Sequence, residues 1–174
     1  ESPVIANDLS NQKVTAIAED TQGHIWIGTF RGLNKNNVHD YHQYFCTDDS
    51  LGLPDNQITH LLRDSKNRFW VGTVNGVCLY TDKDNFRIIP IEADNKNVRQ
   101  ILEDRNGRIF LNTGFQLYAY HPREEKITCV LPEISPGNAF YAQCHIAPDN
   151  NLWVMTSTGL RCYDPSTLQL KESV

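Results

Sequence analysis

The residues best suited to bind a metal ion lie in the string His39-Asp-Tyr-His42. Two imidazoles close in sequence can ligate zinc, but residues three apart on a strand point to opposite faces of the sheet. The string Asp82-Lys-Asp-Asn85 begins like a calcium-binding loop but lacks the glycine and glutamate that complete one. We therefore expect no metal ion and no other cofactor.

Catalytic groups are equally sparse. The chain has no G-x-S-x-G elbow and no order of Ser, His and Asp that suggests a triad. Residues 23–28 have the glycine spacing of a phosphate-binding loop but not its lysine. Asp20, Asp64 and Asp104 stand at equivalent places in repeated strings, which indicates a structural role in turns. We expect no catalytic residue.

The composition is that of an ordinary globular protein, since 40% of the 174 residues are hydrophobic and 21% are charged. The net charge of −5 argues against a nucleic-acid partner, which would need clustered Lys and Arg. The apolar runs are too short to span a bilayer, so any export signal or membrane anchor is expected outside this chain. The five cysteines are odd in number and lack C-x-x-C spacing, so we expect buried free thiols.

The sequence repeats one string, which reads DTQGHIWIGT at residues 20–29, DSKNRFWVGT at 64–73, DRNGRIFLNT at 104–113 and, in a worn copy, NNLWVMT at 150–156. Its aromatic position recurs at intervals of about 40–44 residues, as Trp26, Trp70, Phe110 and Trp153. A period of about 40–45 residues with a fixed aromatic is typical of the four-stranded blades of a propeller.

We predict an all-β fold of β-propeller blades: about four four-stranded antiparallel sheets, over residues 9–46, 53–90, 94–131 and 137–172. The first strands are expected at residues 14–18, 58–62, 98–102 and 141–146. Outer strands are expected at residues 38–45, 86–90 and 126–131. A Gly or Asn at positions 23, 67, 107 and 150 predicts a tight hairpin with positive φ between the first and second strands.

The repeated residues have structural interpretations. Each aromatic is expected to fill the gap between neighbouring sheets as they splay apart. Gly28 and Gly72 are expected to let another backbone or ring come close to the strand. The three repeated carboxylates are expected to accept the amide protons of the hairpin turn.

The pattern of an apolar strand, then D-x-x-G-x-I-W-I-G-T, then G-L resembles the two-component regulator propeller repeat. The first two copies are intact, whereas Phe110 and Asn112 replace Trp and Gly in the third, and Ala147 and Met155 replace Asp and Gly in the fourth. The resemblance covers about residues 9–163. It implies the periplasmic sensor region of an inner-membrane-anchored hybrid two-component histidine kinase of gut anaerobic bacteria. Such a region would bind a carbohydrate or oligosaccharide without catalysis of its own.

Family members carry more than four repeats, so the resemblance also implies a fragment whose partners include the remaining blades of the same protein. Four blades of a larger ring would leave sheet faces exposed. Three arrangements would cover them: closure as a four-bladed ring, pairing of two copies, or truncation of a longer ordered chain. We favour a truncated arc or a homodimer.

A ligand site is predicted from the blade geometry. If the first strands are innermost, the loops that lead into them share one face with the turns between the second and third strands. Those loops carry Asp55, Asn56 and Asn97, and the turns supply our candidate ligand-binding residues, Arg31, Asn75 and Phe115. Sugars are bound by aromatic platforms with amide and Arg donors, which fits this set.

Two other functions stay open at this point. A propeller-fold polysaccharide lyase or glycosidase would need paired carboxylates, or a His and Tyr set, in the central channel. A protein-interaction scaffold is compatible with the fold alone.

Overall fold

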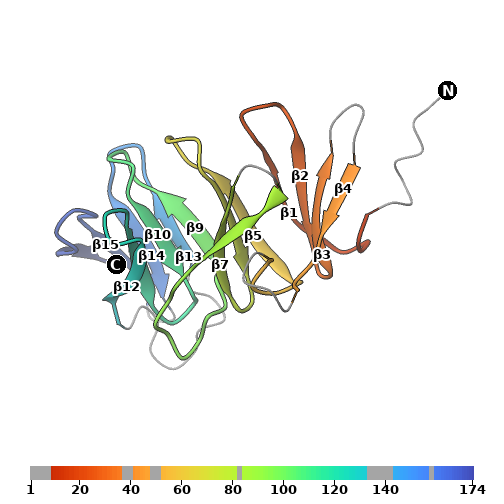
Figure 1. The fold of residues 1–174 in the computed structure, drawn as a ribbon. Helices are drawn as coiled ribbons and strands as arrows, with labels where there is room; N and C mark the ends of the chain where they lie inside the picture. Colours follow the sequence, from red (N-terminus) through yellow and green to blue (C-terminus); the bar gives the residue numbers. More distant parts are fainter. Residues whose placement is uncertain (1–8, 37–40, 48–51, 82–83, 133–142, 157–158) are drawn as a thin grey trace.

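The structure, a computed structural model, describes residues 9–36, 41–47, 52–81, 84–132, 143–156 and 159–174. These residues form four antiparallel sheets of four strands each, with almost no helix. The sheets stand side by side in chain order (Figure 1). The prediction of an all-β fold built of propeller blades is confirmed. Within the described residues, no helix has the length and apolar character that crossing a bilayer requires.

In every sheet the strands are paired in chain order. The first sheet contains β1 (Val14–Glu19), β2 (Ile25–Thr29), β3 (Gly32–Asn36) and β4 (Tyr41–Tyr44). The second contains β5 (Ile58–Arg63), β6 (Phe69–Thr73), β7 (Gly76–Tyr80) and β8 (Phe86–Ile89). The third contains β9 (Gln100–Glu103), β10 (Ile109–Asn112), β11 (Leu117–His121) and β12 (Lys126–Leu131). The fourth contains β13 (Gln143–Ile146), β14 (Leu152–Thr156), β15 (Gly159–Tyr163) and β16 (Leu170–Ser173).

One predicted strand starts later than expected. β9 begins at Gln100 rather than Val98, because Val98 N donates to Thr73 O of the second sheet at 3.0 Å. Arg99 N already bonds to Asn112 O of β10 at 2.8 Å. The predicted strands at residues 38–45 and 141–146 begin in segments that lie outside the described residues. His39, which the sequence analysis considered as a zinc ligand, also lies outside them.

The hairpins between the first and second strands follow the sequence closely. Positive φ occurs at Gly23 (81°), Asn67 (62°), Gly107 (73°) and Asn150 (66°), as predicted. In the first three hairpins, one carboxylate oxygen of the preceding Asp accepts the main-chain N–H groups two and four residues later. The fourth hairpin has Ala147 in place of the Asp and keeps the same main-chain hydrogen bonds, so the turn does not require the carboxylate.

The second carboxylate oxygen has a role that the sequence interpretation missed. Asp64 Oδ2 accepts Trp70 Nε1 at 2.8 Å and Arg68 Nε at 2.6 Å. Asp20 makes the equivalent bonds to Trp26 Nε1 and to the ring of His24. The acid therefore fixes the orientation of the repeated indole as well as the turn.

The repeated aromatic side chains fill the interfaces between sheets. Trp26 and Trp70 are fully buried and Phe110 is 2% exposed. Trp26 contacts Phe69 and Tyr80 of the second sheet, with ring centroids 4.8 and 4.7 Å apart. Three separate apolar clusters result, one at each interface between adjacent sheets.

The glycines of the repeat admit the neighbouring sheet, but side chains rather than a backbone or a ring approach them. A Cβ at Gly28 would lie 2.5 Å from Ile58 Cγ2 on β5. At Gly72 it would lie 3.2 Å from Val98 Cγ1 and 3.3 Å from Ile101 Cδ1. Glycine at these positions therefore allows the first strand of the next sheet to pack close to the second strand of the preceding one.

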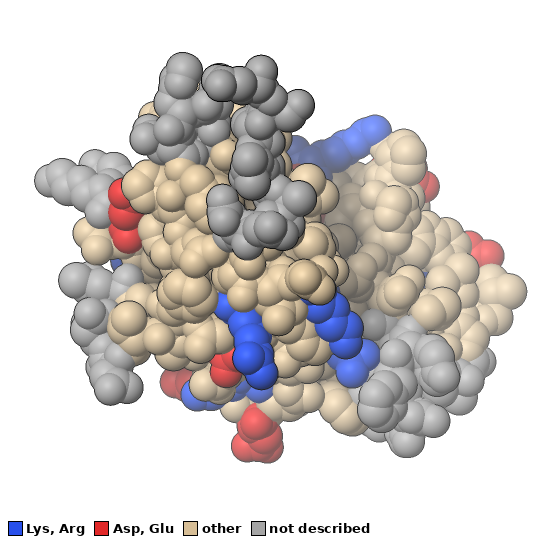
Figure 2. All heavy atoms as spheres, turned by 90° about the vertical axis from the view of Figure 1, so that its right-hand side faces the viewer, with Lys and Arg blue, Asp and Glu red and all other residues tan. Residues whose placement is uncertain are grey.

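The four sheets form an open row within the described residues, because no apolar cluster joins the first sheet to the fourth. At the fourth sheet Trp153 is only partly buried, and Met155 (38%) and Leu160 (37%) are exposed. At the first sheet Val14 (50%) and Ile17 (69%) are exposed. Figure 2 looks onto the end formed by the first sheet and shows a surface that is mostly neither Lys, Arg, Asp nor Glu, with Lys and Arg side chains across its lower middle.

The expectation of buried free thiols is correct for three of the five cysteines. Cys78, Cys144 and Cys162 are buried, whereas Cys46 and Cys129 are exposed. Burial raises the pKa of the Cys144 thiol to about 12, so this thiol stays protonated and packs as a small apolar group. Cys46 follows β4 and Cys129 lies on the outermost strand of its sheet, where one face of the strand meets solvent.

We predict that Trp70→Ala lowers the free energy of unfolding by about 3–5 kcal/mol, because it empties a fully buried site. Trp153→Ala is the matched control and should cost less than half as much, since its indole is already partly exposed. Urea unfolding followed by circular dichroism measures both. Equal losses in the two variants would contradict the role of the indole as interface filler.

The hairpin carboxylates also predict a pH dependence. Burial raises the pKa of Asp20, but hydrogen bonds from Trp26, His24 and two main-chain amides outweigh it and hold the pKa below its usual value. An acid whose pKa is lowered by folding stabilises the fold above its unfolded pKa of about 4. This stabilisation is lost as the pH falls through the folded pKa.

We therefore expect Asp20→Asn to be less stable than the natural chain at pH 7, with a difference that narrows below about pH 4. Unfolding midpoints measured between pH 7 and pH 3 test this. The exposed Asp94→Asn serves as control and should show little difference at any pH. If the difference in unfolding midpoint between Asp20→Asn and the natural chain stays constant from pH 7 to pH 3, the charge of Asp20 does not contribute to stability.

Candidate functional site

The first strand of each sheet is innermost, as the site prediction required, since β1 lies beside β5, β5 beside β9, and β9 beside β13. Main-chain bonds join the turn of one sheet to the loop that leads into the next. Gly32 N donates to Asn56 O at 2.7 Å, and Val98 N donates to Thr73 O at 3.0 Å. The loops and turns therefore share one face, which we call the turn face.

The three predicted ligand-binding residues all lie on the turn face. Arg31, Asn75 and Phe115 occupy the turns between the second and third strands of consecutive sheets, and each is exposed; Phe115 is 48% exposed. The hydroxyls of Thr29 and Thr73 accept the main-chain amides of Arg31 and Asn75. The corresponding turn of the fourth sheet, residues 157–158, lies outside the described residues.

A shallow cavity of about 390 Å³ opens on the turn face near the innermost strands. Its lining comes from the first three sheets and the loops between them: Thr15, Gln57, Ile58, Thr59, Val74, Asn97 and Arg99. None of the three predicted residues lines it, although Val74 is the neighbour of Asn75. The sequence interpretation pointed to Asn97 and missed Thr15 and Thr59 on two innermost strands and Arg99 just before β9, because none of them belongs to a local motif.

Asn97 gives this cavity a recognition group. Its main-chain amide is held by Asn95 Oδ1 at 2.9 Å, whereas its own side-chain Oδ1 is buried and has no hydrogen-bond partner. A buried acceptor without a partner costs about 1–3 kcal/mol. This oxygen has almost no exposed surface, so a ligand hydroxyl would reach it after the Asn97 side chain rotates toward the cavity, and the new hydrogen bond would then recover that energy.

The chemistry of the cavity suits binding better than catalysis. Hydroxyl, amide and guanidinium groups line it, and no carboxylate does. The paired acids that a glycosidase needs are therefore absent from this part of the described chain. Likewise, the described residues contain no cluster of three or more His, Cys, Asp or Glu side chains that could hold a metal ion.

Comparison with known families identifies the repeat. Residues 8–31 and 52–75 match the two-component regulator propeller family. These two segments are two-component regulator propeller repeats. The two matched segments contain the intact strings around Trp26 and Trp70, in agreement with the resemblance noted from the sequence. No curated protein sequence matches the chain significantly.

Solved structures share the fold. The extracellular domain of BT4673 from B. thetaiotaomicron, assigned to a hybrid two-component system, aligns with a TM-score of 0.75 and 24% identity. The alignment covers 92% of this chain and 22% of that one, so the present chain spans about a fifth of its length.

Two further structures carry other functions on similar blades. Virginiamycin B lyase from Staphylococcus aureus aligns with a TM-score of 0.69 and 18% identity, over 92% of this chain and 55% of that one. An auxiliary nutrient binding protein from B. thetaiotaomicron aligns with a TM-score of 0.64 and 11% identity, over 93% and 41%. At these identities the likeness establishes the fold alone.

Proposed function

We propose that this chain is part of the periplasmic ligand-sensing region of a hybrid two-component sensor, and that it binds a carbohydrate or oligosaccharide without catalysing a reaction. The propeller repeats and the likeness to an extracellular sensor domain support the sensor role. The observation that carries the binding role is the turn-face cavity with the buried, unpartnered Asn97 Oδ1.

In this proposal the ligand lies across the turn face. Asn97 and Arg99 hold ligand hydroxyls in the cavity, while Arg31, Asn75 and Phe115 contact the parts of a longer ligand that extend over the turns. Phe115 supplies an exposed ring on which the apolar face of a sugar can stack. Because the cavity is lined by three sheets, a bound ligand would tie them together, and a sensor needs such a ligand-dependent arrangement.

An enzymatic function is the alternative, since a lyase has the same kind of fold. The sensor role is preferred because neither an acid pair nor a His and Tyr set is among the described residues that line the turn-face cavity. Incubation with plant and host polysaccharides, followed by assays for new reducing ends and unsaturated products, distinguishes the two. Product formation by the chain would refute the non-catalytic proposal.

Binding is tested by calorimetric titration of a panel of neutral oligosaccharides into the complete extracellular region that contains this chain. We expect saturable binding of one class of sugar, weakened about tenfold by Asn97→Ala, which corresponds to one lost hydrogen bond of about 1.4 kcal/mol. Glu172→Ala, on the exposed β16, is the control and should bind as the natural protein does. If no sugar binds, the carbohydrate assignment fails.

The open ends of the row lead to a proposal about partners. We propose that further blades of the same protein, or a second copy of the chain, cover the exposed Trp153 end and the exposed Ile17 end. Light scattering of the isolated chain should then detect a dimer whose population rises with concentration. A strict monomer at high concentration would exclude the second copy and leave the further blades.

A further inference from the structure

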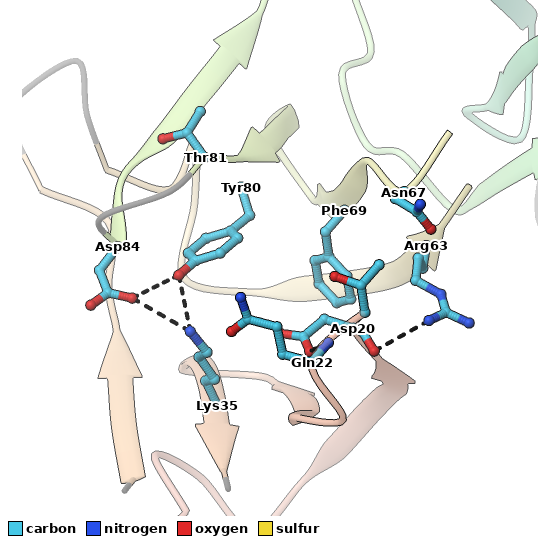
Figure 3. A pocket seen from close by; sticks show the side chains of 10 residues that line it. Asp20, Gln22, Lys35, Arg63, Asn67, Phe69, Tyr80, Thr81 and Asp84 are labelled. Carbon is cyan, nitrogen blue, oxygen red and sulfur yellow. Dashed lines mark hydrogen bonds and ion pairs between the residues drawn. The ribbon is translucent and has the colours of Figure 1, made fainter. Parts of the chain in front are cut away.

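A second cavity, of about 440 Å³, lies between the first and second sheets at the face opposite the turn face. The hairpin after β1 forms one side through Asp20 and Gln22, and Lys35 extends from β3. The second sheet supplies the other side through Arg63, Asn67, Tyr80, Thr81 and Asp84 (Figure 3). This cavity shares no residue with the turn-face cavity.

The propeller repeat provides an internal reference for this cavity. Strand register places Lys35 opposite Trp26, where the second sheet has Leu79 opposite Trp70. Arg63 immediately precedes the hairpin Asp of the second sheet, where the first and third sheets have Glu19 and Glu103. Two cations therefore stand at positions that are apolar or acidic elsewhere, and they come from different sheets to one cavity.

The next interface shows what the ordinary residue does at the position of Arg63. Glu103 reaches the hairpin of the second sheet and accepts Ser65 N at 2.8 Å and Ser65 Oγ at 2.5 Å. At that interface a carboxylate thus bridges the second and third sheets. At the first interface Arg63 Nη1 instead donates to the main-chain oxygen of Asp20 at 3.2 Å, and the cavity stays open.

The Lys35 end of the cavity is neutralised by the protein. Lys35 Nζ lies 3.0 Å from Tyr80 Oη and 3.7 Å from Asp84 Oδ1. Tyr80 and Tyr44 donate to the same Asp84 oxygen, and these hydrogen bonds hold the pKa of Asp84 below its usual value. An ionised Asp84 at this end repels a ligand carboxylate and accepts hydrogen bonds from ligand hydroxyls.

The Arg63 end keeps a positive charge. No carboxylate among the described residues lies within ion-pair distance of the Arg63 guanidinium. The Asp20 carboxylate accepts its hydrogen bonds from Trp26, His24 and two main-chain amides and forms none with the Arg63 guanidinium. Gln22 lies between the two ends and, like Asn67, offers an amide side chain to a ligand (Figure 3).

From this geometry we propose that the cavity between the first and second sheets binds a small hydroxylated carboxylate, a sugar acid of one or two rings. The carboxylate pairs with Arg63, the hydroxyls bond to Gln22, Asn67 and Asp84, and the ring packs near Phe69 and Tyr80. This site is independent of the turn-face cavity and does not require the proposed function. Its volume is in the range of small-ligand sites.

The test titrates this chain with glucuronate and with glucose, and follows binding by calorimetry and by amide NMR. The two sugars differ only at C6, where glucuronate has a carboxylate and glucose a hydroxymethyl group. We expect saturable binding of glucuronate, at least tenfold tighter than glucose, with shifts of the side-chain amides of Gln22 and Asn67. Arg63→Glu should weaken glucuronate at least tenfold, because it introduces the residue type that Glu103 supplies at the next interface. If Arg63→Glu does not fold, Arg63→Gln, which removes the positive charge without adding a negative one, takes its place.

Arg105→Glu is the matched control, since it makes the same charge change on an exposed hairpin of the third sheet. It should bind glucuronate as the natural chain does. Equal affinity for both sugars, no binding of glucuronate, or unchanged binding by the Arg63 variants overturns the inference. Asn97→Ala separates the two sites: if it weakens glucuronate while Arg63→Glu does not, the acid binds at the turn face, so this inference fails and the proposed function stands.

Discussion

Neighbouring sheets splay apart, and the rest of the structure depends on the large side chains that pack into the space between them. The strand ladders hold each sheet together but do not join one sheet to the next. That joining is done by Trp26, Trp70 and Phe110, which are buried against the following sheet. The hairpin acid orients each indole through its Nε1, so one carboxylate couples the local turn to the long-range packing. Where no sheet follows, as at Trp153, the same side chain is partly exposed.

Residues that recur in each copy of the repeat have a structural role, whereas residues found in one copy alone are candidates for ligand recognition. Asp, Trp and Gly recur because every interface has the same geometric requirement. Residues that depart from the repeat at an interface have no such explanation, and Lys35 and Arg63 are of this kind. Burying part of a lysine against Trp26 and Tyr80 costs desolvation that Leu79 avoids at the next interface. In return, the Lys35 ammonium holds Tyr80 and Asp84 in place at one end of the cavity.

The fold could be predicted from the sequence because the same string occurs four times, and each copy indicates the same hairpin and strand. The hairpin glycines and asparagines, the outer strand at residues 126–131 and the turn positions of Arg31, Asn75 and Phe115 all follow from it. The side chains that line the cavities do not, because Thr15, Thr59 and Arg99 meet only when three first strands come together. The change from Glu19 and Glu103 to Arg63 can be read from the sequence, one residue before the repeated string, but its meaning requires the contacts across an interface.

The three apolar clusters of the chain are separate, one per interface. Each sheet therefore exchanges packing energy only with its immediate neighbours, so a substitution at one interface leaves the other two undisturbed. Evolution can then copy a blade, keep its Asp and Trp, and alter a handful of boundary residues to create a new specificity. A protein built in this way diversifies what it recognises by duplication and local drift, without redesigning its core.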